Sequence, residues 1–352
     1  MTNNQLHRRD FLKLVGAGAA APALSPLMSL TEPLVPSAGE AGRRNPDRDK
    51  STAELVEIMR RELEPLFAGR EMALVFRRFA DDGSESFSIQ INENELYPVA
   101  SAFKSFLALY YFMTFPPDEW NYTPGSLVYS TVVYSNNGTT GSLLHEVGLR
   151  VDGPGNAIEK FNDFLLNVMG LEHGLYSWNW PGRPTYGLTD PRFTPTEDRR
   201  VWIRTLSQSV SNVTTALDLA KGWEFISRAS QNPRWSDPHF REAIRITREI
   251  SAIPANDYRS PIEKVIYSGY IGKDGTLPLG DLAVGRVIND AGIVRVANGE
   301  YVISFMSTGE NESTTQPALQ KVIDCIRMYE EQFYPPGQIY ITGQSHPLYE
   351  DG

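Results

Sequence analysis

The chain has a single cysteine among its 352 residues, five scattered histidines and no glycine-rich loop of the kind that binds phosphate. The single cysteine, Cys325, excludes an internal disulfide, and its place in an apolar helical pattern predicts a buried thiol. The histidines lack the spacing of a zinc motif such as His-Glu-x-x-His, which places two ligands on one helix face. The sequence therefore predicts no metal and no other cofactor.

Positive charge is also scarce: 33 Lys and Arg stand against 43 Asp and Glu, a formal net charge of −10. This balance argues against nucleic acid, and against an anionic membrane surface, as a partner. With 41% hydrophobic and 22% charged residues, the composition is normal for a soluble globular protein. The length suits one compact unit of two lobes after the N-terminal segment, and the oligomeric state stays open.

The N-terminal segment is basic over residues 7–13 and then weakly apolar and alanine-rich. It lacks the run of about 20 strongly apolar residues that a membrane-spanning helix needs. The segment resembles a twin-arginine signal, an address that an export receptor reads. The resemblance implies the twin-arginine export machinery as a partner, delivery to the periplasm or the cell exterior, and no stable membrane anchor. Cleavage after Ala21 and cleavage after Ala23 both stay open.

Residues 98–104, Pro-Val-Ala-Ser-Ala-Phe-Lys, precede a helical run over 105–111. Among the lysines of the chain, only Lys104 has a serine three residues before it. Residues three apart on a helix share a face, so the Lys104 amine can lie beside the Ser101 hydroxyl. A serine hydroxyl is a poor nucleophile until a neighbouring base takes its proton. The pattern predicts Ser101 as a nucleophile with Lys104 as its base, and an exposed helix start is the alternative.

This stretch resembles the active-site serine region of class A β-lactamases and the related penicillin-recognising D,D-peptidases. Their chains carry three elements in order: Ser-x-x-Lys, Ser-Asp-Asn and Lys-Thr-Gly. The second is similar to Ser135-Asn136-Asn137, which has asparagine where the family has aspartate. The resemblance implies that Ser135 relays a proton to the leaving nitrogen and that Asn137 hydrogen-bonds the substrate's amide side chain. A plain polar turn before a helix is the alternative, since serine and asparagine are common caps.

The third element is similar to Lys273-Asp274-Gly275-Thr276, with aspartate at its middle position. The resemblance implies that Lys273 holds a substrate carboxylate and that Gly275 and Thr276 contribute to substrate binding. It also implies an oxyanion hole made by the main-chain N–H groups of Ser101 and Thr276.

Asp274 is a departure from the Lys-Thr-Gly pattern, which has threonine at this position. A carboxylate at Asp274 would repel a substrate carboxylate, which argues against ordinary penicillin binding. Two alternatives stay open. One is the register Tyr267-Ser268-Gly269, which lacks the lysine, and the other is a hairpin turn at Asp274-Gly275, a strong turn dipeptide.

Class A β-lactamases also carry a glutamate on an Ω-loop, in a Glu-x-x-Leu-Asn pattern, which activates the deacylating water. The corresponding region, about residues 176–212, lacks that pattern. Its candidate carboxylates are Asp190, Glu197 and Asp198, and Thr194-x-x-Glu197 is also typical of a structural capping box. Without such a base the acyl-enzyme would persist, as in a penicillin-binding protein or a slow hydrolase.

The hydrophobic pattern predicts the main elements of the fold. The pattern predicts a buried strand over 72–79, a turn at 81–83, an alternating strand over 87–91, a strand rich in β-branched residues over 287–294, and a further strand over 301–305. An amphipathic pattern predicts a helix over 317–333, and Thr214 or Thr215 caps another helix. The resemblance, which covers about residues 70–330, implies an α+β fold: an antiparallel sheet flanked by N- and C-terminal helices, plus a mostly helical lobe.

We expect the chain to divide accordingly. The expected parts are the signal and the start of a linker over 1–38, a disordered linker over 39–51, an α/β lobe from 52–100 and 256–335, a helical lobe over 101–255, and a tail over 336–352.

These patterns together predict a serine hydrolase that forms an acyl-enzyme on Ser101, with β-lactam hydrolysis as the first hypothesis. Lys104 must be neutral at the moment of attack, so burial or a nearby cation must lower its pKa. One alternative is a D,D-peptidase-like or other amide or ester hydrolase that acts on peptidoglycan-like cell-wall fragments. Another is a non-catalytic binding protein on the same fold, which Asn136 and Asp274 favour.

Overall fold

The computed structural model describes residues 50–177, 189–194, 212–254, 260–266, 269–277, 285–296 and 299–333. The predicted signal, nearly all of the predicted linker and the predicted tail lie outside these residues. Residues 44–352 form one compact unit, and the two-lobe division stays a prediction.

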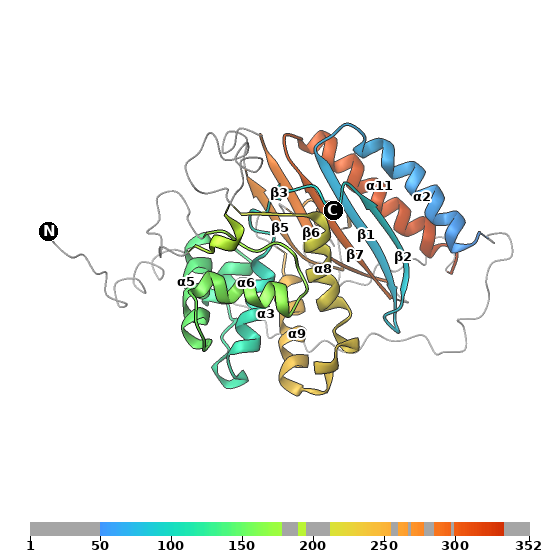
Figure 1. The fold of residues 1–352 in the computed structure, drawn as a ribbon. Coiled ribbons are helices and arrows are strands. Elements are labelled where there is room, and N and C mark those ends of the chain that lie inside the picture. Colours follow the sequence, from blue (N-terminus) through green and yellow to red (C-terminus); the bar gives the residue numbers. More distant parts are fainter. Residues whose placement is uncertain are drawn as a thin grey trace, which may run out of the picture. The chain divides into compact units, whose positions relative to one another are not determined.

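A five-stranded antiparallel sheet forms the centre of this unit, with strand order β2-β1-β7-β6-β5 (Figure 1). Side chains on both faces of the central strands are buried, because helices cover the sheet on each side. The predicted strands and the turn between the first two are confirmed. The strands are β1 (Met72–Ala80), β2 (Glu85–Ile91), β5 (Tyr270–Leu277), β6 (Val287–Val296) and β7 (Gly299–Ser307), and a separate short pair joins β3 (Tyr97–Pro98) to β4 (Val213–Thr214).

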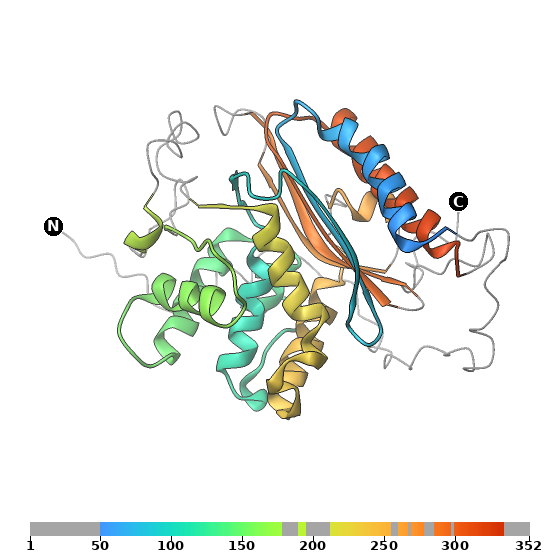
Figure 2. The same ribbon diagram turned by 45° about the vertical axis from the view of Figure 1, so that its right-hand side comes forward.

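Two long helices, α2 (Thr52–Phe67) and α11 (Glu312–Glu330), lie side by side on one face of the sheet (Figure 2). A capping box starts α2, in which Ser51 and Glu54 satisfy each other's backbone N–H groups. The C-terminal helix begins five residues before the predicted start, because the Asn311 side chain caps it. Pro317 therefore lies inside the helix instead of opening it.

The opposite face of the sheet is covered by helices of the mostly helical region. Of these, α8 contacts β1, β6 and β7, and its N-cap is Thr215, one of the two predicted caps. The α+β class with an antiparallel sheet, terminal helices and a helical region is thus confirmed. The elements of this region are α3 (Lys104–Thr114), α4 (Leu127–Val132), α5 (Asn137–Arg150), α6 (Ala157–Asn167), α8 (Ala216–Ser227) and α9 (Pro238–Ser251), with 3₁₀ turns at Pro117–Glu119, Pro191–Phe193, Ala229–Gln231 and Pro233–Ser236. The short helix α10 (Glu263–Ile266) instead contacts α11 on the other face of the sheet.

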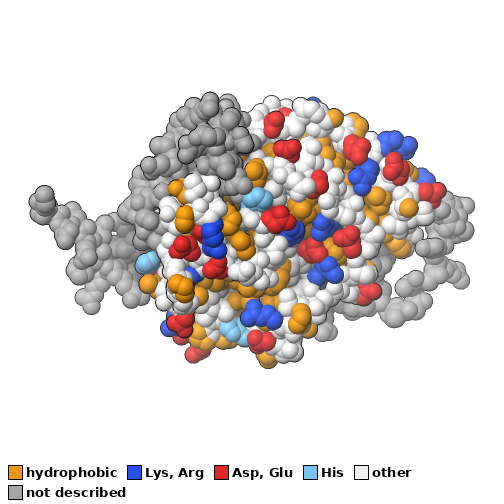
Figure 3. All heavy atoms as spheres, viewed as in Figure 1, with side chains coloured by type: hydrophobic (Ala, Val, Ile, Leu, Met, Phe, Trp, Pro, Cys, Tyr) orange, Lys and Arg blue, Asp and Glu red, His pale blue; other side chains and the backbone are white. Residues whose placement is uncertain are grey.

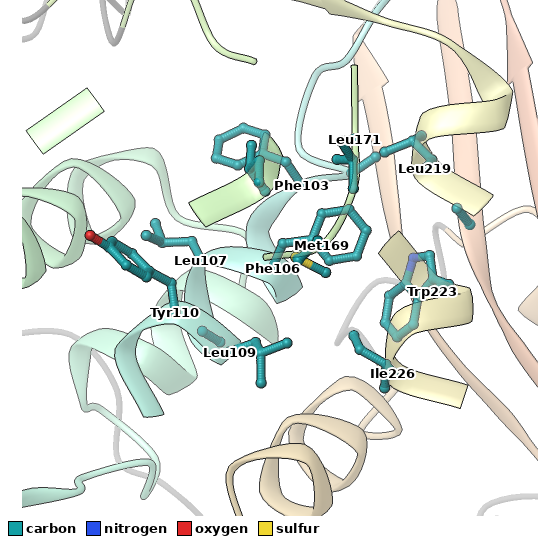
Figure 4. Packing of buried hydrophobic residues seen from close by; sticks show 14 of the residues in the cluster. Phe103, Phe106, Leu107, Leu109, Tyr110, Met169, Leu171, Leu219, Trp223 and Ile226 are labelled. Carbon is teal, nitrogen blue, oxygen red and sulfur yellow. The ribbon is translucent and has the colours of Figure 1, made fainter. Parts of the chain in front are cut away.

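The helical region packs around α3, which is buried along most of its length. Phe106 of this helix meets Trp223 of α8 with ring centroids 5.7 Å apart (Figure 4). A Cβ at Gly222 would lie 2.4 Å from the Phe106 ring, so only glycine permits this approach. The packing fixes α3, and with it the start of the helix at Lys104.

Acidic and basic side chains are interspersed over the described part of the face in Figure 3. Cys325 is buried in α11, as predicted. In the described part of the chain, no helix combines the length and the apolar character needed to cross a membrane. Within those same residues, no group of three or more His, Cys, Asp or Glu side chains could hold a metal ion.

Candidate active site

Ser101 lies in a tight turn between β3 and α3. The turn is closed by a hydrogen bond from the Lys104 N–H to the Ser101 carbonyl oxygen, 3.1 Å long. Ala100 just before it has φ +50°, a conformation that costs energy in a residue with a Cβ. The helix itself starts at Lys104 with Phe103 as N-cap, so Ser101 precedes the helix rather than opening it.

A side chain of strand β6 holds the segment just before Ser101 in place. The Asn289 side chain is fully buried, and its Nδ2 donates to the carbonyl oxygen of Pro98 at 2.6 Å. Its Oδ1 accepts from the Ser307 N–H at 3.3 Å. Sequence reasoning missed this residue, and the signal that could have found it is a polar pair inside an otherwise apolar strand.

Gly275 lets strand β5 pass close to Ser101. A Cβ at this glycine would lie 2.9 Å from the Ser101 backbone nitrogen and 2.8 Å from that of Ala102, and these backbone atoms cannot easily move. The Lys-Asp-Gly-Thr stretch lies within β5 and pairs with β6 over the whole strand, so the hairpin alternative is wrong. The rival Tyr267 register lies outside the described residues.

Lys104 joins the first and second motifs. Its side chain is fully buried, and its Nζ lies 2.6 Å from the Ser135 carbonyl oxygen and 2.7 Å from Asn137 Oδ1. The Ser135 hydroxyl lies 3.3 Å from the same nitrogen, in a residue with φ +52°. Within the described residues, the hydrogen bonds of Lys104 Nζ go to Ser135 and Asn137, and none goes to the Ser101 hydroxyl.

The surroundings of Lys104 favour its neutral form. Burial lowers the pKa of its amine well below the ordinary 10.5. The Lys273 ammonium lowers the pKa further, and the Asp274 carboxylate opposes it. The amine can therefore accept a proton at a pH where an exposed lysine cannot.

Asn136 holds the loop that carries Ser135. It is the N-cap of α5, and its Oδ1 accepts from the Thr139 N–H at 3.0 Å. Asparagine thus performs at this position the capping that an aspartate also performs. The predicted turn before a helix and the predicted motif are one and the same loop.

Lys273 is almost completely buried and is paired with its neighbour in sequence. Its Nζ lies 2.5 Å from Asp274 Oδ1 and 3.1 Å from the Asp274 carbonyl oxygen. On the next strand, Asp290 stands opposite Asp274 in the sheet register. Burial and the charge of Asp274 raise the pKa of Asp290 to about 6, although Ser260, Tyr270 and the Ile262 N–H donate to it.

Asp190 is buried within a set of hydrogen bonds. Asn162 Nδ2 lies 2.8 Å, and Arg192 Nη2 2.7 Å, from its Oδ2. Burial acts to raise the pKa of Asp190, but the hydrogen bonds from Arg192 and Asn162 prevail and lower it. This environment favours a structural role over that of a base. Glu197 and Asp198 lie outside the described residues.

Hydrogen bonds between Ser177 and Asn212 link the two ends of the segment that lies between these residues in the sequence. The Ser177 N–H donates to Asn212 Oδ1 at 3.0 Å, and Asn212 Nδ2 donates back to the Ser177 carbonyl oxygen at 2.7 Å. The Asn212 carbonyl oxygen also accepts from the Val99 N–H at 3.0 Å, two residues before Ser101. The ends of this segment are therefore fixed beside the nucleophile turn, a link that the sequence did not reveal.

Comparisons with known proteins identify an export signal at the N-terminus and the fold of the rest of the chain. Residues 5–25 match the family model of the TAT (twin-arginine translocation) pathway signal sequence, so the predicted export signal, with a periplasmic or extracellular destination, is confirmed. No curated protein matches this chain.

Solved class A β-lactamases share the fold. The chain superposes on the TLA-3 extended-spectrum β-lactamase with TM-score 0.52 and 14% identity, covering 78% of this chain and 98% of that one. The class A β-lactamase of Bacteroides cellulosilyticus gives TM-score 0.52 and 14% identity over 79% and 99%. That of Clostridium kluyveri gives 0.50 and 13% over 77% and 99%. The class A-like fold predicted from the sequence is confirmed.

Proposed function

We propose that this chain is a serine hydrolase that forms an acyl-enzyme on Ser101, with the amide of a β-lactam ring as its first candidate substrate. The observation that carries the proposal is the state of Lys104. Its amine is buried, has a lowered pKa, bonds to the Ser135-Asn137 loop and follows Ser101 by one turn. A neutral buried amine next to a serine is the base that this chemistry needs.

The proposed reaction proceeds by acyl transfer. The Ser101 hydroxyl oxygen attacks the carbonyl carbon while its proton passes to Lys104 Nζ. The main-chain N–H groups of Ser101 and Thr276 stabilise the oxyanion, which the close approach of Gly275 to Ser101 supports. Ser135 then passes a proton to the leaving nitrogen, the carbon–nitrogen bond breaks, and an ester remains on Ser101. Asn137 binds the substrate's amide side chain.

Release of the product requires water to attack this ester. Of the three candidate bases, Asp190 is the one that lies within the described residues. Its carboxylate already accepts hydrogen bonds from Arg192 and Asn162. This observation favours a second candidate function, a D,D-peptidase-like or other amide or ester hydrolase acting on cell-wall fragments, in which the acyl-enzyme is long-lived. A non-catalytic binding protein is the third, and a trapped acyl adduct would eliminate it.

Intact mass spectrometry of the mature protein with a penicillin and a cephalosporin, followed over time, tests the proposal. We expect an adduct in the wild-type protein and none in Ser101→Ala. Decay of the adduct with release of product indicates a β-lactamase, and persistence indicates a peptidase-like enzyme. Labelling that survives Ser101→Ala would contradict the nucleophile assignment.

A further inference from the structure

The Lys273 ammonium lies in the candidate site with its charge already paired. Its Nζ has three protons to donate, and both the side-chain and main-chain oxygens of Asp274 accept from it. The two side chains are 4% and 12% exposed, so water screens the pair weakly. We propose that this pair selects acyl donors without a carboxylate on the leaving-group side, so that uncharged esters and amides are preferred to anionic ones. The inference rests on the proposed function.

A second buried carboxylate adds to the negative charge beside the pair. Asp290 is fully buried and stands opposite Asp274 on the neighbouring strand. The rise in its pKa comes partly from the charge of Asp274. An incoming carboxylate would meet a Lys273 ammonium that is already paired with Asp274, and the fully buried Asp290 would act on it only through its charge, an arrangement that discriminates against anions.

The space next to the ion pair is small. A cavity of about 30 Å³ lies beside β5, lined in part by Val132, Ser260, Tyr270, Gly272, Lys273 and Asp274. This volume holds one or two water molecules. Lys273 therefore has no room on that side to turn away from Asp274 toward a bulky anionic substrate.

The Lys273–Asp274 pair also affects the pKa of Lys104, the proposed base. The Lys273 ammonium lowers the pKa of Lys104, and the Asp274 carboxylate opposes this effect and is the smaller of the two. A bound carboxylate would add a further negative charge and favour the protonated, inactive form of Lys104. An uncharged donor leaves the amine free to accept the Ser101 proton.

The test compares a penicillin with its methyl ester, which has the same ring but no free carboxylate. The rate of adduct formation is followed by intact mass spectrometry. In the wild-type protein we expect the ester to react at least about tenfold faster than the acid. In Asp274→Asn that ester-to-acid ratio should fall at least about tenfold, because the Lys273 charge is freed. Asp324→Asn, an exposed site on α11, is the matched control and should keep the wild-type ratio.

The outcomes separate the two proposals. A wild-type protein that reacts faster with the acid, or an Asp274→Asn ratio equal to the wild type, overturns the selection against carboxylates and leaves the acyl-enzyme intact. A wild-type protein that reacts with neither compound overturns the proposed function, and this inference with it. If Asp274→Asn does not fold, Asp274→Thr gives the same comparison with the family's own residue.

Discussion

Lys104 is the residue whose protonation decides whether the proposed reaction can occur. Lys104→Arg keeps a long basic side chain, but a guanidinium stays charged and cannot give up its proton at any accessible pH. We expect adduct formation to slow by at least about 10²-fold, since a general base contributes that much or more. The rate is measured by intact mass spectrometry with the penicillin methyl ester. Lys321→Arg, on an exposed part of α11, should react at the wild-type rate, and an equal rate in Lys104→Arg would refute the role of Lys104.

Residue motifs in the sequence predicted which side chains to examine, but not their partners. Ser-x-x-Lys spacing suggested a direct contact between Ser101 and Lys104, whereas the hydrogen bonds of Lys104 go to the Ser135-Asn137 loop. The pairing of Lys273 with its neighbour Asp274 was likewise not foreseen. Both contacts depend on burial and side-chain direction, which spacing alone does not fix. The chemical roles of these residues stay predictions.

At the scale of elements, strand β6 holds the nucleophile turn through Asn289. Asn289→Ala leaves the buried Pro98 carbonyl oxygen without its donor, which typically costs about 1–3 kcal/mol of stability. Because the turn that carries Ser101 loses its support, we expect adduct formation to slow at least about tenfold at temperatures where the variant is fully folded. Urea unfolding and mass spectrometry measure the two effects.

The matched control for this element is Asn94→Ala, at an exposed asparagine outside the sheet. It should change neither the stability nor the rate. A stability loss in Asn289→Ala with an unchanged rate would show that Asn289 serves the core and does not position Ser101.

Strands were predicted better than helix ends and long-range contacts. Apolar runs marked β1 and β7, and a run of β-branched residues marked β6, because both faces of these strands are buried. The start of α11 was misplaced because Pro317 resembles a helix start while Asn311 provides the cap. The bond from Asn289 to Pro98 spans 191 residues, so no local pattern could reveal it.

At the scale of the whole molecule, Asp290 makes folding stability depend on pH. Its pKa is about 6 in the folded protein against an ordinary 3.8, so the folded state holds this proton more tightly than the unfolded state. Its contribution is therefore most favourable below about pH 4 and is lost as the pH rises toward 6. The loss amounts to about 3 kcal/mol at pH 7.

Asp290→Asn removes this titration, because asparagine carries no proton that is lost over the range. Relative to the variant, the wild-type protein should lose about 2.4 kcal/mol of unfolding free energy between pH 4 and pH 7. Urea unfolding at pH 4, 5, 6 and 7 measures the difference. A difference that stays constant with pH would show that the pKa of Asp290 is not raised in the folded protein.

The whole molecule thus combines an export signal with a class A β-lactamase fold and a candidate site built from its three motifs. The most direct test of its central claim is to locate the acyl group by tandem mass spectrometry of a protease digest, after brief reaction with the penicillin methyl ester. The account predicts the added mass on the Ser101 hydroxyl, and no added mass in Ser101→Ala. An acyl group found on Ser135, Lys104 or any other residue of the wild-type protein would contradict it.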